Sequence, residues 1–119
     1  MEQSVCSSKL LKYINEIERL MVKYNLTLRL PEVSECKALL TDGKYLETLS
    51  RINTSKWWGE SSIADIYLTS TYSDEISRDM AILETNLFRI ACLLEDEGIY
   101  NKDAQEVVFQ LSSWGYKVD

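Results

Sequence analysis

The sequence predicts an all-α fold in which about five helices form a bundle around a long central amphipathic helix. Three observations support this prediction. Apolar residues recur at three- and four-residue steps over several stretches, residues that end helices lie between those stretches, and no strand-like run has a second run with which to pair. The 119 residues suit a single helical domain over 1–119, because a chain of this length buries roughly two-thirds of the surface that it exposes when unfolded.

The first two helices follow from the sequence near the amino terminus. A helix is expected from about Ser7 to Tyr24, and Asn25 is placed to end it. Pro31, the only proline, suits the first turn of a second helix that runs to about Leu40. One apolar stripe of the first helix must face the core, formed by Leu10, Ile14, Ile17, Met21 and Tyr24.

The middle of the chain is less regular. A third helix is expected from Lys44 to about Ile52, with an apolar set of Tyr45, Leu46, Leu49 and Ile52. The run 63–68 cannot be assigned to helix, strand or loop by periodicity alone. A helical turn or irregular loop is favoured, because a lone strand would leave its backbone donors without acceptors.

The longest periodic stretch predicts the central helix, from Asp74 to about Glu97, with Ser73 placed to cap its start and Gly98 to end it. Its main stripe consists of Ile76, Met80, Leu83, Leu87, Ile90 and Leu94. Further apolar positions broaden the buried face, so we expect this helix to pack between several others rather than to form a dimer zipper. A last helix is expected from Asp103 to about Ser113.

Residues suited to catalysis or metal binding are sparse. The chain has no histidine, which is the commonest general base and metal ligand. Its three cysteines are widely spaced and form no C-x-x-C pair, so neither a disulfide framework nor a zinc site is indicated. The acidic run 95–97 suits a solvated helix end, because adjacent helical positions point in different directions. We therefore expect a protein that is not an enzyme and that uses no cofactor and no metal.

Charge and targeting signals narrow the expected partners. The chain has 13 basic and 19 acidic residues, a formal charge of -6, which disfavours nucleic acid and anionic membranes and favours a basic protein partner. No apolar run approaches the roughly 20 residues needed to cross a bilayer, and the amino terminus does not resemble a signal peptide. We expect a cytoplasmic protein.

The tryptophan pair Trp57 and Trp58 begins a segment unlike the helical sequence around it. Adjacent side chains point to different sides of a helix or strand, so one ring can remain outside the core. In the favoured interpretation one ring is buried and the other covers it, and in the alternative one ring contacts a partner. Asp65 either accepts hydrogen bonds from the turn at Ser61 and Ser62 or offers its carboxylate to a cationic group of a partner.

This segment also resembles a known family. It fits the pattern W-G-x-x-S-I-x-D-[IL]-x-[IL], carried by Trp58, Gly59, Ser62, Ile63, Asp65, Ile66 and Leu68 and followed by a long amphipathic helix. Over about residues 44–97 the chain is similar to small helical bacterial proteins whose signature is a Gly-x-Gly-Ser-[IVL]-x-Asp-[IL] turn, with departures at Glu60 and Ser61. Members of that kind are often immunity proteins of polymorphic toxins, including contact-dependent growth inhibition systems.

The resemblance implies a protein that binds and neutralises a cognate toxin domain, commonly a basic nuclease, through an acidic surface. Opposite charges would speed the encounter, and a few buried aromatic anchors would supply affinity. The expected partner-binding carboxylates are Glu60, Asp65, Asp74, Glu75, Asp96 and Glu97. The expected anchors are Tyr67, Tyr72, Tyr100, Tyr116 and one of the two residues Trp57 and Trp58.

Two other classes stay open. A non-enzymatic helical adaptor would hold a partner helix in an apolar groove, with the stripe of the central helix as part of the groove floor. A small enzyme would need two carboxyl groups that converge in one cleft, and the sequence brings no such pair together.

Overall fold

Six α-helices and one 3-10 helix make up the part of the chain that the structure describes, and that part has no strand. The computed structural model describes residues 3–59, 62–65, 74–113 and 115. In chain order the elements are α1 (Gln3–Lys23), α2 (Leu30–Thr41), α3 (Tyr45–Ile52), α4 (Ser55–Trp58), η1 (Ile63–Asp65), α5 (Asp74–Asp96) and α6 (Lys102–Ser113). The predicted all-α fold is confirmed. The helix count is six rather than about five, because the single turn of α4 was not expected as a helix.

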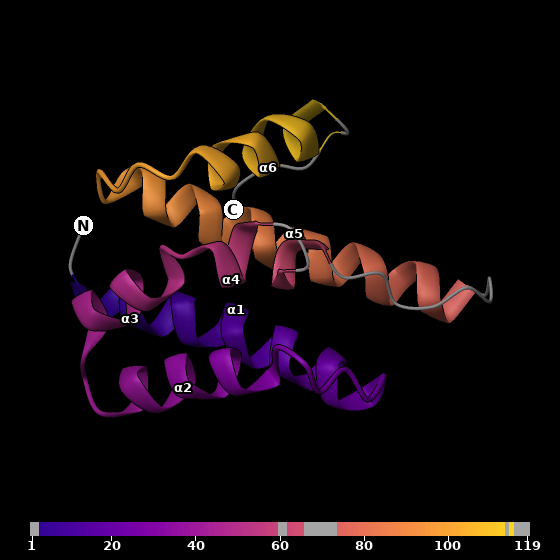
Figure 1. Cartoon of the computed structure of the whole chain (residues 1–119), viewed down its shortest axis with the longest axis horizontal. Coiled ribbons are helices and arrows are strands. Elements are labelled where there is room, and N and C mark those ends of the chain that lie inside the picture. The colour runs from indigo at the N-terminus through magenta and orange to yellow at the C-terminus, as the bar shows by residue number, and fades with distance from the viewer. Residues whose placement is uncertain (1–2, 60–61, 66–73, 114, 116–119) are drawn as a thin grey trace.

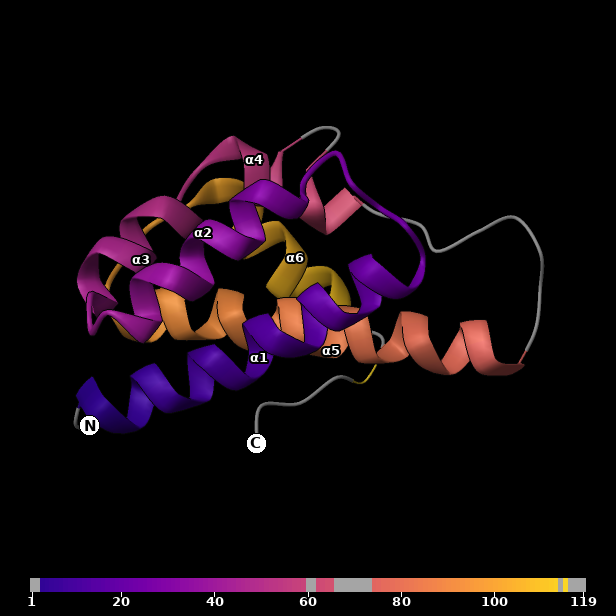
Figure 2. The ribbon, with the colours of Figure 1, turned by 90° about the horizontal axis from the view of Figure 1, so that it is seen from below.

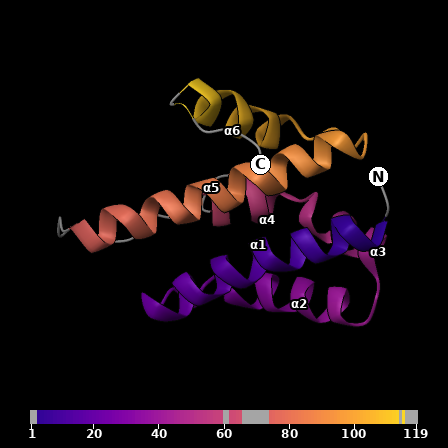
Figure 3. The same ribbon diagram turned by 180° about the vertical axis from the view of Figure 1, so that it is seen from behind.

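Helix α5 lies at the centre of the arrangement. It packs against α1 and against α6, and α2 packs against α1 (Figures 1 and 3). The ion pair between Lys23, at the end of α1, and Glu75, near the start of α5, shows that these two helices run antiparallel. Helices α3 and α4 lie to one side of the layer that α1 and α5 form (Figure 2). The central helix therefore packs between several helices, as its broad apolar face predicts.

Three helices end in the same hydrogen-bonded turn. The residues that follow α1, α2 and α5 include Asn25, Gly43 and Gly98, with φ of 55°, 77° and 76°. At Gly98 the amide and that of the next residue donate to carbonyls three and five residues earlier, at 3.0 and 2.9 Å. This pattern satisfies carbonyl groups that a helix end otherwise leaves open. The stop signals at Asn25 and Gly98 are confirmed.

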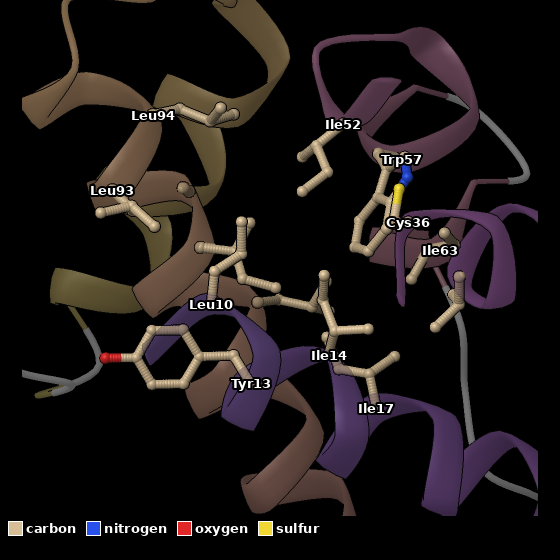
Figure 4. Close-up of a cluster of buried hydrophobic side chains, with 14 of the residues drawn as sticks. Leu10, Tyr13, Ile14, Ile17, Cys36, Ile52, Trp57, Ile63, Leu93 and Leu94 are labelled. Carbon is tan, nitrogen blue, oxygen red and sulfur yellow. The ribbon is translucent and has the colours of Figure 1, made fainter. Parts of the chain in front are cut away.

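The predicted apolar stripes meet in one core (Figure 4). The side chains of α1 and α5 that lie fully inside it include Leu10, Ile14, Ile17, Leu83, Ile90 and Leu94. The prediction that Leu46 belongs to the buried apolar set of α3 is wrong, because this side chain is 63% exposed. Its neighbour Tyr45 faces the core, and a rotation of about 100° per residue turns Leu46 away from it.

The overall dimensions are those of a compact chain. The radius of gyration is 13.6 Å, close to the value of about 13.5 Å that is typical of a folded chain of this length. Within the described ranges, every helix is too short or too polar to cross a bilayer.

Candidate partner-binding site

Both tryptophans of the central segment lie in the core. Trp57 is 1% exposed and Trp58 is 5% exposed, and their ring centroids lie 6.3 Å apart. Helix α4 is enclosed by η1 and α6, and Trp57 lies beside Cys36 of α2 (Figure 4). Both rings therefore pack inside the core, and neither forms an exposed aromatic surface.

Gly59, which follows α4, is closely packed. A Cβ atom at Gly59 would lie 2.9 Å from the carbonyl oxygen of Ser55. Any residue other than glycine would therefore require the backbone to shift. Ser62 and Ile63, which follow, are buried. Glu60, Tyr67, Tyr72, Tyr116 and the side chain of Asp65 lie outside the described residues, and their proposed contacts stay predictions.

The four remaining carboxylates of the expected site do not form one surface. Asp74 and Glu75 begin α5, whereas Asp96 ends it and Glu97 follows it. At 1.5 Å per residue, the two ends of this helix are about 33 Å apart. One partner contact of ordinary size cannot be centred on both pairs.

Glu75 belongs to a cluster that joins α1 to α5. The Lys23 ammonium lies 2.6 Å from a carboxylate oxygen of Glu75 and 2.6 Å from one of Asp79. The hydroxyl of Tyr24 donates to the same Asp79 oxygen at 2.6 Å. The hydrogen bond from Lys23, followed by that from Tyr24, lowers the pKa of Asp79. These contacts give Glu75 and Asp79 structural partners within the chain.

Most other carboxylates of the first three helices are also paired. Helices α1 and α2 are joined by Lys37, which lies 2.8 Å from Glu18. The remaining pairs are Arg19 with Glu16 at 2.9 Å, Arg51 with Glu35 at 3.0 Å, and Arg29 and Lys56 with Glu32 at 3.5 and 3.7 Å. Positive side chains therefore neutralise the acidic residues on this part of the molecule.

One end of the molecule differs, and we call it the acidic end. Here the turn between α2 and α3, the start of α3, the end of α5 and the start of α6 come together (left in Figure 1). The Tyr45 hydroxyl donates to Glu97 at 3.2 Å, and the Asn101 amide donates to Asn53 at 2.7 Å, so these contacts join α3 and the residue after it to the turn between α5 and α6. The exposed carboxylates of the acidic end are Asp42, Glu47, Glu95, Asp96, Glu97 and Asp103.

These six carboxylates have no ion pair among the residues that the structure describes. Two lysines, Lys44 and Lys102, lie on the same segments, so the local balance is negative. Three of the carboxylates also lie at the carboxyl end of α5, where the helix dipole is negative and the last turn has no basic residue. This arrangement costs stability, and a cationic partner would remove the cost.

Exposed apolar side chains lie among these carboxylates. Tyr100, in the turn between α5 and α6, is 69% exposed, and Leu46 of α3 is 63% exposed. Of the anchors expected from the sequence, Tyr100 is the one whose exposure the structure describes. The acidic end thus carries two exposed apolar side chains beside its carboxylates.

Several residues of the acidic end were missed by reasoning from sequence. Leu46 was assigned to the core, and Asp42, Glu47 and Asp103 were not assigned to any site. Their proximity depends on contacts between α3 and the turn that joins α5 to α6. These segments are far apart in the sequence, so no local sequence pattern predicts the contacts. The acidic run 95–97 was the signal of this site in the sequence, because three consecutive carboxylates at the carboxyl end of a helix lie at the negative end of its dipole.

No group of three or more carboxylates and thiols that could hold a metal ion occurs among the described residues. Comparison with family models, with curated proteins and with solved structures gave no match.

Proposed function

We propose that this chain is an immunity protein, which binds a basic toxin domain through its acidic end and so neutralises it. One observation carries the proposal: exposed carboxylates without ion pairs gather at this end around Tyr100 and Leu46, whereas the acidic residues of α1 and α2 are mostly paired. The formal charge of -6 and the family resemblance of residues 44–97 point to the same class of partner.

The mechanism of inhibition is electrostatic competition. A nuclease holds its polyanionic substrate with lysine and arginine side chains, and a preformed cluster of carboxylates can occupy those side chains instead. Opposite charges raise the association rate, while burial of Tyr100 and Leu46 supplies the slow dissociation. In this proposal Asp96 and Glu97 keep the partner-binding role expected of them, Tyr100 keeps its expected role as an anchor, and Leu46 takes the anchoring role expected of a tryptophan.

The test is co-expression of this chain in a bacterial host with any basic toxic domain whose gene adjoins the gene of this chain, with survival of the host as the measurement. Wild type should protect, and a variant with Tyr100→Ala and Leu46→Ala should lose protection while its circular dichroism spectrum stays helical. The matched control is Phe109→Ala, which removes another exposed ring, 79% exposed, from the middle of α6. Protection by the double variant equal to that of wild type would contradict the proposal.

The adaptor alternative has less support. Its groove floor would include the stripe of α5, yet Leu83, Leu87, Ile90 and Leu94 are each less than one-tenth exposed. The helices of the chain already cover these positions, and no observation on the described residues favours a helix-binding groove there.

A further inference from the structure

Helix α6 packs on the side of α5 that faces away from α1 (Figures 1 and 3). Asp79 marks the side of α5 that faces α1, because it pairs with Lys23. At about 100° per residue, Phe88 and Ala91 lie about 120–180° round the helix from Asp79, yet both are buried. The burial of this far side of α5 therefore depends on what packs there, and α6 is the described helix that does so.

Helix α6 buries little of its own surface. Of its 12 residues, Ala104 and Leu111 are buried. Val107 and Val108 lie on the same stripe and are half-buried, whereas Phe109 lies on the opposite side and is 79% exposed. In α3, by comparison, four of 8 residues are buried. With so few buried apolar side chains, α6 gains only a small free energy from packing on α4 and α5.

Polar contacts tie the other helices together more firmly than they tie α6. Lys23 joins α1 to α5, Lys37 joins α2 to α1, and Arg51 joins α3 to α2. Within the described chain, the side chains of α6 form no ion pair or hydrogen bond with another helix. The nearest polar contacts belong to Asn101, whose amide donates to Asn53 at 2.7 Å and whose Oδ1 atom accepts from the first turn of α6. These contacts hold the turn before α6 rather than the helix itself.

We propose that α6 is a strap, a helix that detaches from α4 and α5 as one unit while the other helices stay folded. The hinge is the turn 97–101, where Gly98 has the left-handed conformation. A helix of 12 residues is only marginally stable by itself in water, so α6 loses its helical hydrogen bonds once it detaches. Detachment uncovers the side of α5 that carries Phe88 and Ala91.

Detachment also changes the acidic end, and this one consequence rests on the proposed function. Asp103 belongs to α6, and Tyr100 lies in the hinge. A partner that binds these residues in their docked arrangement favours the docked strap, because a ligand stabilises the state that it binds. The detachment itself is a property of the free chain, so it is tested without a partner, and its failure is distinct from failure of the proposed function.

The test is native-state hydrogen exchange of the purified full chain, followed by NMR at low concentrations of denaturant. We expect the amides of residues 106–113 to share one opening free energy, smaller than that of the amides in the middle of α1. Leu111→Ala should speed exchange of the α6 amides about tenfold, because it leaves a cavity in the docked state and keeps a good helix former. The matched control Phe109→Ala changes the exposed side of the same helix and should leave their exchange within about twofold of wild type.

A variant outside the strap separates detachment from global unfolding. Ile17→Val removes one methylene group from a fully buried side chain of α1, so it should speed exchange in α1 severalfold. Exchange in α6 should stay unchanged, because α1 keeps its packing while the strap is open. Equal exchange in α6 and α1, an equal response of both helices to Ile17→Val, or rates in α6 that rise steadily toward residue 113 without a shared value would overturn the proposal.

Discussion

The two adjacent tryptophans, Trp57 and Trp58, differ in what their indole nitrogens contact, although both lie in one helical turn. Trp58 donates to the Ile52 carbonyl, whereas Trp57 has only a thiol beside its indole nitrogen. The ring of each is buried, so both contribute apolar packing. The hydrogen bond of Trp58 to a carbonyl oxygen thus adds more to stability than the contact of the Trp57 N–H group with the Cys36 thiol, a weak acceptor.

Replacement by phenylalanine should separate these contributions. We expect Trp58→Phe to lower the free energy of unfolding by about 0.5–1.5 kcal/mol more than Trp57→Phe does, because Trp58 loses a hydrogen bond to a carbonyl oxygen whereas Trp57 loses only a contact with a thiol, a weak acceptor. The Ile52 carbonyl still accepts from the amide of Thr54 at 2.8 Å, so it is not left unpaired. Urea unfolding followed by circular dichroism measures the difference, and an equal or larger loss in Trp57→Phe would contradict this assignment.

The buried thiol beside Trp57 makes a second prediction at this scale. Burial raises the pKa of Cys36 to about 12, so almost no thiolate exists near neutral pH. Burial, and then the charges of Glu95 and Asp96, raise the pKa of Cys92 to about 11. Iodoacetamide at pH about 8 should therefore leave Cys36 unmodified in the native chain and alkylate it once the chain is unfolded in urea. Peptide mass mapping distinguishes the three cysteines, and rapid native modification of Cys36 would refute the prediction.

Among the elements, α1 and α5 are joined by a cluster in which a buried carboxylate, that of Asp79, accepts from two donors. Asp79 is 6% exposed and accepts from both Lys23 and Tyr24. Its pKa is lower in the folded chain than the reference value of 3.8. The stabilisation that this carboxylate provides is therefore complete above pH about 4, and it is lost as the pH falls through the folded pKa.

Asp79→Asn should remove this part of the pH dependence. We expect the free energy of unfolding of wild type to fall more steeply below pH about 4 than that of Asp79→Asn, and the variant to be less stable at neutral pH. The control is Glu75→Gln, which changes the more exposed partner of the same lysine, with a side chain 63% exposed, and should have a smaller effect. Parallel curves for wild type and Asp79→Asn, measured by denaturant titration, would show that the cluster contributes nothing.

Most helix ends followed from the sequence because their signals are local, although α1 begins at Gln3, four residues before the predicted start at Ser7. Pro31 occupies the first turn of α2, and Gly98 has the left-handed conformation that ends α5. Helix α4 was not predicted, since its four residues are too few to show a periodic stripe. Leu46 was wrongly assigned to the core because it lies next to the apolar stripe of α3 in the sequence. Only the packing of neighbouring helices shows which of these apolar residues are covered.

At the scale of the whole molecule, charge is distributed unevenly. Cations pair with carboxylates along α1 and α2, whereas the acidic end keeps its carboxylates without ion pairs among the described residues. The net charge was readable from composition, but its location was not. That location depends on which positive side chains reach which carboxylates, and those contacts join segments such as Lys23 and Asp79 that are far apart in the chain.

This distribution is the physical basis of the proposed inhibition. A contact centred on the acidic end should be sensitive to salt, because exposed charges are screened over about 8 Å at physiological ionic strength. Charges at the far end of α5, about 33 Å away along the helix, should contribute little to it.

The most direct test compares Asp96→Lys with Asp74→Lys in stopped-flow association with the cognate basic domain. Each variant changes the net charge equally, at opposite ends of α5, and both residues are exposed. We predict that Asp96→Lys lowers the association rate about tenfold at low salt and that Asp74→Lys changes it little, with the difference vanishing as salt is raised. Equal rates for the two variants at low salt would contradict the assignment of binding to the acidic end.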